Sequence, residues 1–234
     1  MLLGSFDLLL DDPAGFVRLT VLVVLSLVVA ITVHEFGHAL VATGLGDNTA
    51  KRLGRLSLNP MRHLDPTGSA LMLLAGFGWG KPVPVDQRQL AHGHTGTSLV
   101  AAAGPLSNLV VAFIVALPIK LGLLDSTRPG LDRVAHVMTG GLQEGLADIA
   151  NLMIFFNLLL AVFNLIPLSP LDGSRVAAAF VPPEHTSGYA RLQRNGPAIL
   201  MVIVLLDFTF GFGILWGYII GPLVGQLTTV ATGG

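Results

Sequence analysis

The chain of 234 residues contains no cysteine, which excludes disulfide bonds, thiolate catalysis and cysteine-ligated zinc or iron–sulfur sites. Charge is scarce as well, because only 12% of the residues are charged and the formal net charge is −1. Without a basic or acidic field, binding to nucleic acid or to a polyanionic substrate has little support. Any metal ion must therefore be bound by His, Asp, Glu or backbone oxygen.

Apolar residues, in contrast, are abundant. They make up 52% of the chain, and the mean hydropathy of +0.73 lies far above that of a soluble globular domain. The composition therefore predicts an integral membrane protein. The first residues lack the positively charged start and the small-residue cleavage site of a secretory signal, so we expect them to belong to the mature chain.

Four apolar stretches are long enough to cross a bilayer as helices. We expect an all-α polytopic membrane protein with about four transmembrane helices, over residues 16–45, 99–122, 146–167 and 198–225. The last stretch contains several glycines and also fits two separate pieces, but we favour one span. Residues 1–234 then form a single membrane-embedded domain with a core at about 16–181 and a C-terminal span at 198–225.

A shorter apolar stretch, residues 69–86, lies between the first two spans. Its KPVPV sequence at 81–85 alternates valine with proline, which suits an edge strand because proline has no N–H to pair. We expect a short re-entrant hairpin with an edge strand here. Such a structure is tolerated at membrane depth only where helices bury it or where it lines a wet cavity.

Basic residues predict the orientation of the spans. Nine of the 13 Lys and Arg residues fall in segments 46–66, 81–97 and 173–195. By the positive-inside rule these segments face the cytoplasm and the N-terminus lies outside the cell membrane. The first and third spans then run in the same direction, so the ends of both arrive at the cytoplasmic face.

The sequence HEFGH at 34–38 places ionisable groups in the first span. His34 and His38 stand at i and i+4, on one helical face about 5 to 6 Å apart, which suits two ligands of one tetrahedral zinc ion. Glu35 can take a proton from water at the metal. The probability that a chain of this composition contains the pattern by chance is about 0.003. A catalytic site needs a third protein ligand, and Asp172 is the acid that follows the third span.

Each of these residues also has a purely structural interpretation. The two histidines can pair with polar neighbours, although ionisable residues at membrane depth usually mark a functional site. Asp172 can cap the helix that follows it, and Pro167 and Pro170 can simply end the third span. The presence of HEFGH favours ligation over capping for Asp172.

Four further motifs accompany HEFGH: AAAGPLSN at 101–108, FNLIPLSPLDG at 163–173, LNPMRHLDPTG at 58–68 and GFGWGKPVPV at 76–85. Together they resemble the site-2 protease family of intramembrane zinc metalloproteases, in its compact prokaryotic branch. The resemblance covers about residues 20–180. It implies a zinc metalloendopeptidase that hydrolyses a peptide bond in or near a transmembrane segment, as in regulated intramembrane proteolysis.

The resemblance also implies roles for single residues. One Zn²⁺ per chain is bound by His34, His38 and Asp172, and Glu35 is the catalytic base. The expected partners are a transmembrane protein or peptide substrate and the lipid bilayer, with no nucleic acid. The connector at 123–145 is too short for a PDZ domain and no CBS domain follows the last span, so we expect substrate selection without such domains.

Substrate contacts are implied in the same way. Asn108 and Asn164 are expected near the bound substrate or its oxyanion, although both can equally act as hydrogen-bonding contacts between helices. The strand that pairs with an unwound substrate segment consists of Lys81, Pro82, Val83, Pro84 and Val85.

Other polar residues have weaker functional interpretations. His92 and His94 lie in a Gly-rich loop and are expected to be solvated. His63 and Asp65 either orient the metal ligands as hydrogen-bond partners outside the ligand set or form a turn before Pro66. Asp207, within the last apolar stretch, should face the helix bundle, where a polar packing contact is favoured over a role in gating.

Two rival functions remain. One is a proton- or ion-coupled transporter that uses a relay of His34, Glu35, His38, Asp172 and Asp207, but no internal repeat supports it. The other is a catalytically silent membrane scaffold of the same fold, against which the intact HEFGH and LDG motifs argue.

Overall fold

The computed structural model describes residues 6–75, 79–124, 141–210 and 213–233, and within these ranges every regular element is helical. This confirms the predicted all-α fold class. The helices are α1 (Phe6–Asp11), α2 (Pro13–Gly44), α3 (Thr49–Arg52), α4 (Pro66–Ala75), α5 (Gly93–Lys120), α6 (Leu142–Asn164), α7 (Asp172–Ala178), α8 (Thr186–Phe210) and α9 (Gly221–Thr232). Short 3-10 turns occur at Pro60–Arg62 and Pro183–His185, and a π-helical turn at Trp216–Ile220 leads into α9.

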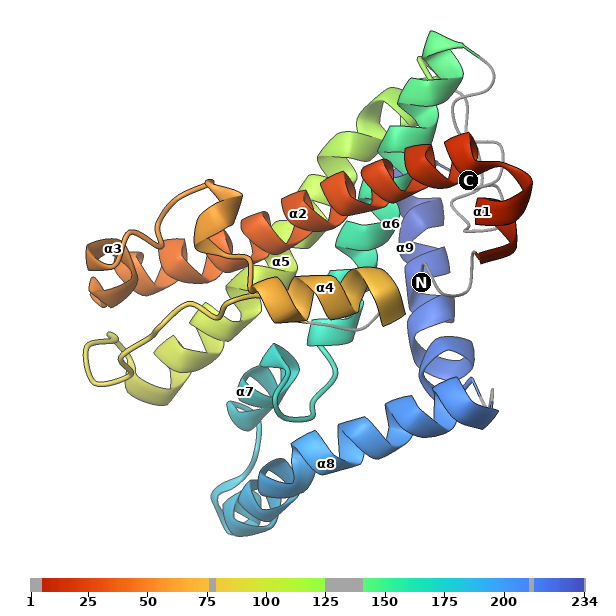
Figure 1. Cartoon of the computed structure of the whole chain (residues 1–234). Helices are drawn as coiled ribbons and strands as arrows, with labels where there is room; N and C mark the ends of the chain where they lie inside the picture. Colours follow the sequence, from red (N-terminus) through yellow and green to blue (C-terminus); the bar gives the residue numbers. More distant parts are fainter. Residues whose placement is uncertain (1–5, 76–78, 125–140, 211–212, 234) are drawn as a thin grey trace.

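Among the described residues, α2, α5 and α6 are long and apolar enough to cross a membrane. They match the first three predicted spans, although α5 begins earlier than expected, at Gly93. The three helices pack against one another in the centre of the molecule (Figure 1). The protein is therefore a polytopic α-helical membrane protein.

Small residues bring α2 and α5 into close contact. A Cβ atom at Gly37 would lie 2.8 Å from the carbonyl oxygen of Ala103 and 2.8 Å from Oγ of Ser107. The hydroxyl of Ser107 donates to the carbonyl of Val33 at 3.0 Å. Membrane helices associate through close packing and interhelical hydrogen bonds of this kind, because lipid tails are as apolar as leucine. The contact sets the HEFGH turns of α2 directly against the AAAGPLSN turns of α5.

The segment expected to be an edge strand is extended but forms no ladder within the described residues. Gly80 makes one isolated antiparallel bridge with Leu64, and the N–H of Lys81 donates to the carbonyl of His63 at 2.7 Å. The pairing stops there because Pro82 and Pro84 have no N–H to continue it. The predicted hairpin consists of α4 and this extended segment, with residues 76–78 lying outside the described ranges.

The last apolar stretch, predicted as one span over 198–225, is instead divided between two helices. α8 ends at Phe210, and Gly213 adopts a φ of +64° that favours glycine. Both carboxylate oxygens of Asp207 accept backbone N–H groups, from Ile214 and from Leu215, at 2.7 Å each. α9 then turns up along the bundle while α8 crosses below it (Figure 1). Asp207 thus makes a polar contact, but with the backbone at the break between the helices and not with the helix bundle that it was expected to face.

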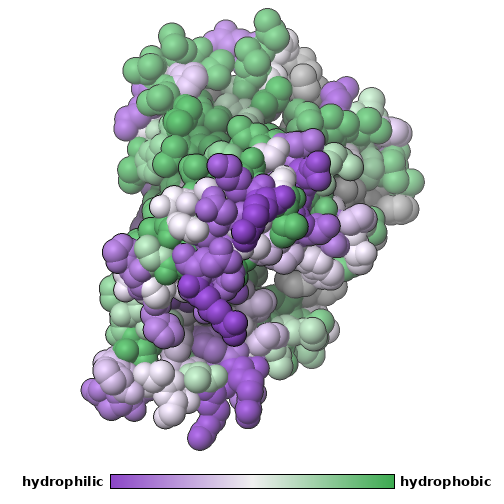
Figure 2. All heavy atoms as spheres, turned by 90° about the vertical axis from the view of Figure 1, so that its left-hand side faces the viewer, coloured by the Kyte–Doolittle hydropathy of each residue, from purple (hydrophilic) through white to green (hydrophobic). Residues whose placement is uncertain are grey.

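Hydrophilic side chains gather at the end of the molecule that carries α3 and its neighbouring loops (Figure 2). Lys51 and Arg52 of α3, and Arg62 after it, are exposed there. Hydrophobic side chains dominate the upper part of the same view. This separation is what a membrane-embedded bundle with one basic, water-facing end requires.

Candidate metal centre

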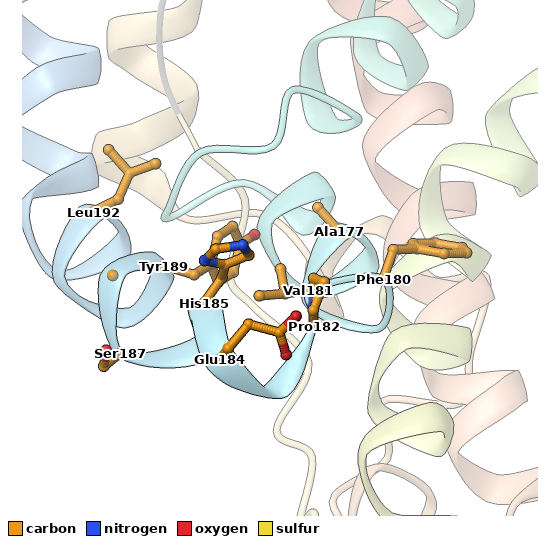
Figure 3. Close-up of a pocket in the computed structure, with 10 residues that line it drawn as sticks. Ala177, Phe180, Val181, Pro182, Glu184, His185, Ser187, Tyr189 and Leu192 are labelled. Carbon is orange, nitrogen blue, oxygen red and sulfur yellow. The ribbon is translucent and has the colours of Figure 1, made fainter.

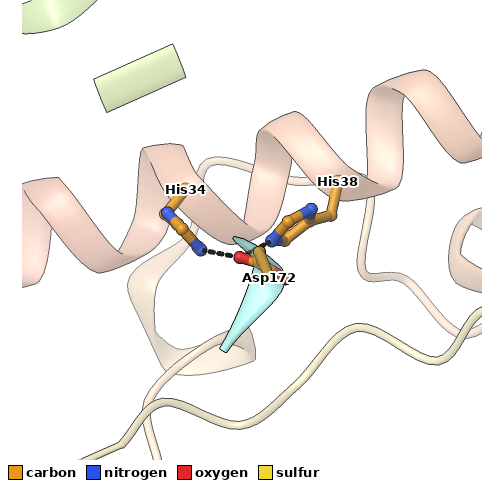
Figure 4. A group of neighbouring side chains, drawn as sticks. All are labelled: His34, His38 and Asp172. Carbon is orange, nitrogen blue, oxygen red and sulfur yellow. Dashed lines mark hydrogen bonds and ion pairs between the residues drawn. The ribbon is translucent and has the colours of Figure 1, made fainter. Parts of the chain in front are cut away.

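Three side chains that are far apart in the sequence meet at the centre of the bundle. Nε2 of His34 and Nε2 of His38 lie 3.0 Å and 3.2 Å from Oδ2 of Asp172 (Figure 4). Each side chain offers one ligand atom, and these atoms all lie within 4.8 Å of one another. His34 and His38 are 6% and 8% exposed, so both imidazoles are shielded from solvent, whereas Asp172 is half-buried. The structure brings together the three residues predicted as zinc ligands.

The α7 helix carries Asp172 to this position. Asp172 is the first residue of α7 and Leu171 is its N-cap, so the carboxylate is not the capping group that was the structural alternative. Gly173 lies in tight contact with the carbonyl oxygens of Leu165 and Ile166, which leaves no room for a Cβ atom. The hydroxyl of Ser98 in α5 donates to the carbonyl of Arg175 at 2.8 Å. α7 is therefore held against the ends of both α5 and α6.

In both histidines, a hydrogen bond made by Nδ1, the ring nitrogen that faces away from Asp172, fixes the orientation of the ring. Nδ1 of His34 lies 2.7 Å from Oδ1 of Asn108, and Nδ1 of His38 lies 2.7 Å from the carbonyl oxygen of Val100. Both partners are oxygens that only accept, so each Nδ1 carries the proton and donates it. The lone pair of each Nε2 is left directed at Asp172. Metal-ligating histidines in proteins are oriented in this way by an acceptor behind the ring.

The space between the two rings matches a metal ion. A Cβ atom at Gly104 would lie 2.7 Å from Nε2 of His34 and closer still to Nε2 of His38, so only a glycine leaves this position open. Three lone-pair atoms that converge repel one another unless a cation lies between them. Two imidazoles and a carboxylate are also ligands that zinc commonly takes, at about 2.0 to 2.2 Å. The donor set and the opening at Gly104 both fit Zn²⁺.

Glu35 lies next to the metal-binding group but is turned toward the extended segment. Its Oε2 accepts the backbone N–H of Val83 at 3.0 Å. Gly80 is also near, since a Cβ atom there would lie 3.8 Å from Oε1 of Glu35. The predicted base and the predicted substrate-pairing segment are therefore in direct contact.

A buried carboxylate that the sequence did not single out anchors the far end of this segment. Asp47 is fully buried and accepts the backbone N–H of Thr49 at 2.8 Å and that of Asp86 at 2.7 Å. Burial alone would raise the pKa of Asp47, but the hydrogen bonds from Thr49 and Asp86 lower it. In the sequence, LGDNT after the first span looks like an ordinary turn, and no local signal marks the distant partner at Asp86.

The two predicted substrate asparagines occupy different environments. Asn108 is fully buried, and its Nδ2 donates to the carbonyl of Ala30 at 2.9 Å and to Oδ1 of Asn157 at 2.8 Å. Since its Oδ1 faces His34, the side chain holds this histidine in place and matches the interhelical alternative. Asn164 is half-buried, and its Nδ2 donates to the carbonyl of Leu160 at 2.9 Å.

The remaining candidates lie outside the metal-binding group. Oδ1 of Asp65 accepts the N–H of Gly68 at 2.8 Å, as expected of a turn before α4. His63 is fully buried and contacts the carbonyl of Ser57 through Nε2 at 2.6 Å. His92 and His94 are exposed, as predicted.

A separate surface pocket of about 570 Å³ lies between the end of α7 and the start of α8 (Figure 3). Glu184, His185, Ser187 and Tyr189 contribute its polar side chains. None of the three clustered metal-binding side chains lines it.

A buried His–x–x–x–His pair with a carboxylate, set among membrane-spanning helices, defines the class of membrane metalloproteins with an H-E-x-x-H zinc site. The family model of peptidase family M50 matches residues 22–206, and the chain belongs to this site-2 protease family. It is a zinc metalloprotease by family, and its cofactor is Zn²⁺.

The related proteins carry matching names. "Putative zinc metalloprotease YwhC" of Bacillus subtilis is 39% identical over 193 residues, which cover 82% of this chain and 83% of that protein. "Putative zinc metalloprotease Rip2" of Mycolicibacterium smegmatis is 30% identical, over 83% of this chain and 70% of that protein. The protein of the same name in Mycobacterium tuberculosis is 28% identical, over 88% and 75%. No solved structure matches the chain significantly.

Proposed function

We propose that this protein is an intramembrane zinc metalloendopeptidase that hydrolyses a peptide bond in or near a transmembrane segment of a membrane-protein substrate. The observation that carries the proposal is the convergence of His34, His38 and Asp172 beside Glu35, among helices that are long and apolar enough to cross the membrane. In this proposal the three converging residues are the metal ligands and Glu35 is the catalytic base.

When bound, zinc supplies a lowered pKa for a coordinated water and a positive charge that polarises the scissile carbonyl. Glu35 accepts a proton from the attacking water through a carboxylate oxygen. The remaining hydroxyl group adds to the carbonyl carbon, and Glu35 passes its proton to the amide nitrogen as the C–N bond breaks. The two products are a carboxylic acid and an amine, so the water is fully accounted for.

The extended segment 81–86 supports the handling of a helical substrate. A transmembrane helix hides its carbonyls in its own hydrogen bonds, and each backbone group that is released in the membrane without a partner costs several kcal/mol. Backbone groups of Lys81 to Val85 offer partners to an unwound substrate segment, in the manner of strand addition. The hydrogen bond from the Val83 N–H to Glu35 supports this role, because a substrate paired with the segment would lie next to the proposed base.

The site is proposed to open toward the cytoplasm, with the N-terminus outside. The exposed basic residues of α3 and the loop after it support this orientation under the positive-inside rule. Water reaches Glu35 from that polar end.

The test is metal analysis and cleavage by the purified protein, reconstituted with a transmembrane substrate, beside a Glu35→Gln variant. Both proteins should bind about one zinc per chain, and only the wild type should cleave. Glu184→Gln, a change at an exposed glutamate of the 3-10 turn before α8, is the matched control and should cleave normally. Zinc-free wild type, or equal cleavage by Glu35→Gln, would refute the proposal.

Orientation needs its own experiment. Because the chain has no cysteine, single cysteines at the exposed positions Lys51 and His185 can be labelled without background. A membrane-impermeant reagent should reach both from the cytoplasmic side. Labelling of the two positions from opposite sides would show that the spans do not converge as proposed.

A further inference from the structure

A third asparagine, Asn157 of α6, is fully buried among the membrane-spanning helices. It belongs to none of the motifs that identify the metal-binding group. Its Nδ2 donates to the carbonyl of Met153 at 2.8 Å, and its Oδ1 accepts from Nδ2 of Asn108 at 2.8 Å. Asn108 in turn accepts the Nδ1 proton of His34 at 2.7 Å. A continuous chain of hydrogen bonds thus joins α6 to the first histidine.

The chain has a single direction. An amide side chain can turn over and exchange its oxygen and nitrogen, but the carbonyl of Met153 can only accept. This forces Nδ2 of Asn157 toward Met153 and its Oδ1 toward Asn108. Oδ1 of Asn157 and the carbonyl of Ala30 then hold Nδ2 of Asn108, which leaves Oδ1 of Asn108 facing His34.

The direction matters at the histidine. If Asn108 turned over, its Nδ2 would face Nδ1 of His34, and that nitrogen would have to accept. The ring proton would then sit on Nε2, where it blocks the lone pair that a metal ion needs.

We propose that Asn157 is a positioning residue for the zinc site, which fixes the amide of Asn108 and through it the proton on Nδ1 of His34. The inference rests on the proposed role of His34 as a ligand. Two measurements test it without any cleavage assay: the zinc affinity and the position of the proton on the His34 ring.

The decisive variant is Asn157→Leu, which has the same branched shape and number of heavy atoms in its side chain and neither amide group. Mutation of a residue that hydrogen-bonds to a metal ligand typically lowers metal affinity about 10- to 100-fold. For Asn157→Leu we expect the zinc dissociation constant to rise about tenfold. In the metal-free wild type, ¹⁵N chemical shifts should show the His34 proton on Nδ1 alone. In Asn157→Leu they should show a mixture of the two ring forms.

Two matched variants separate positioning from packing. Asn151→Leu makes the same chemical change at another buried asparagine of α6, outside the amide chain, and should bind zinc like the wild type. Asn157→Asp, with its carboxyl group protonated, donates to the carbonyl of Met153 and keeps an oxygen that accepts from Asn108, so it should restore most of the affinity. Should Asn157→Leu fail to fold, Asn157→Ala makes the same deletion with a smaller side chain.

Equal zinc affinity and equal His34 ring signals in Asn157→Leu and Asn151→Leu would overturn the inference. So would an Asn157→Asp protein that binds zinc as weakly as Asn157→Leu. A wild-type protein that binds no zinc would instead overturn the proposed function, while the ring signals of the metal-free protein would still test the amide chain.

Discussion

The backbone N–H of Val83 donates to Oε2 of Glu35 over 3.0 Å. One N–H cannot serve both this carboxylate and the carbonyl of a substrate strand. In the proposed mechanism, a substrate that pairs with Val83 takes over this donor and leaves Oε2 of Glu35 free to accept a proton from water. In the absence of substrate, the bond from Val83 occupies Oε2.

Replacing Val83 by proline tests this exchange. Val83→Pro removes the N–H in a segment that is already extended between prolines, so a substrate carbonyl loses its donor. We expect the cleavage rate of a transmembrane substrate to fall about tenfold or more, as for the loss of a hydrogen bond to a buried group. Zinc content should not change. Val83→Ala keeps the N–H and is the control, and an equal loss of rate in both variants would count against the exchange.

Gly104 offers a test of the metal position that needs no substrate. In Gly104→Ala the methyl group would lie 2.7 Å from Nε2 of His34, in the space that the ion needs. We expect the purified variant to contain almost no zinc while remaining folded. Gly44→Ala places a methyl group where no atom lies within 4 Å, at the end of the same helix that carries the histidines. A Gly104→Ala protein with a full complement of zinc would mean that the ion lies elsewhere.

Asp47 makes stability depend on pH. Its pKa in the folded protein is below the ordinary value of 3.8, so its contribution is complete above that value and is lost as the pH falls through the folded-state pKa. Asp47→Asn offers one acceptor oxygen in place of two, and should lower the free energy of unfolding by about 1–3 kcal/mol at pH 7. The deficit should shrink below about pH 4.

Denaturant unfolding of the metal-free protein in detergent, from pH 7 down to pH 3, measures this deficit. The metal-free form is used because zinc binding has a pH dependence of its own. Asp11→Asn, at an exposed aspartate, should cost little at any pH. A deficit of Asp47→Asn that stays constant across the range would contradict the assignment.

Asp207 should act on stability alone. Asp207→Ala leaves the N–H groups of Ile214 and Leu215 without their acceptors at the start of the turn that leads into α9. By comparison with lost helix N-caps, we expect the unfolding free energy to fall by about 0.5–2 kcal/mol. Zinc affinity should stay at the wild-type value, and Thr209→Ala, at an exposed position nearby, is the control. A large loss of zinc in Asp207→Ala would instead favour a functional role for this carboxylate.

The sequence carried enough information for the first three spans and for the three side chains that converge as the candidate metal centre. Hydropathy identifies α2, α5 and α6 because crossing a bilayer requires a long apolar run. The pair His34 and His38 is recognisable because helical spacing alone brings i and i+4 together. Asp172 could be added because charge predicts which helix ends share a face.

Contacts that depend on the packing of helices could not be read in the same way. Asn157 and Asp47 bond to partners that lie far away in the chain, and an asparagine or aspartate gives no local sign of such a partner. Hydropathy did not reveal the break between α8 and α9. It carries no information on whether Asp207 can accept the free backbone N–H groups at the start of a new helix. The roles of Asn108 as a hydrogen-bonding contact and as a substrate contact were indistinguishable until its neighbours were known.

Both imidazoles of the metal-binding group owe their orientation to α5, through Asn108 and through the carbonyl of Val100. The metal site is therefore already formed once the helices have packed. The entropic cost of ordering its side chains falls on folding and not on metal binding. Assembly in the bilayer and loading with zinc become separable events. A chelator should then remove the zinc ion and leave the protein folded, so that added zinc binds again without refolding.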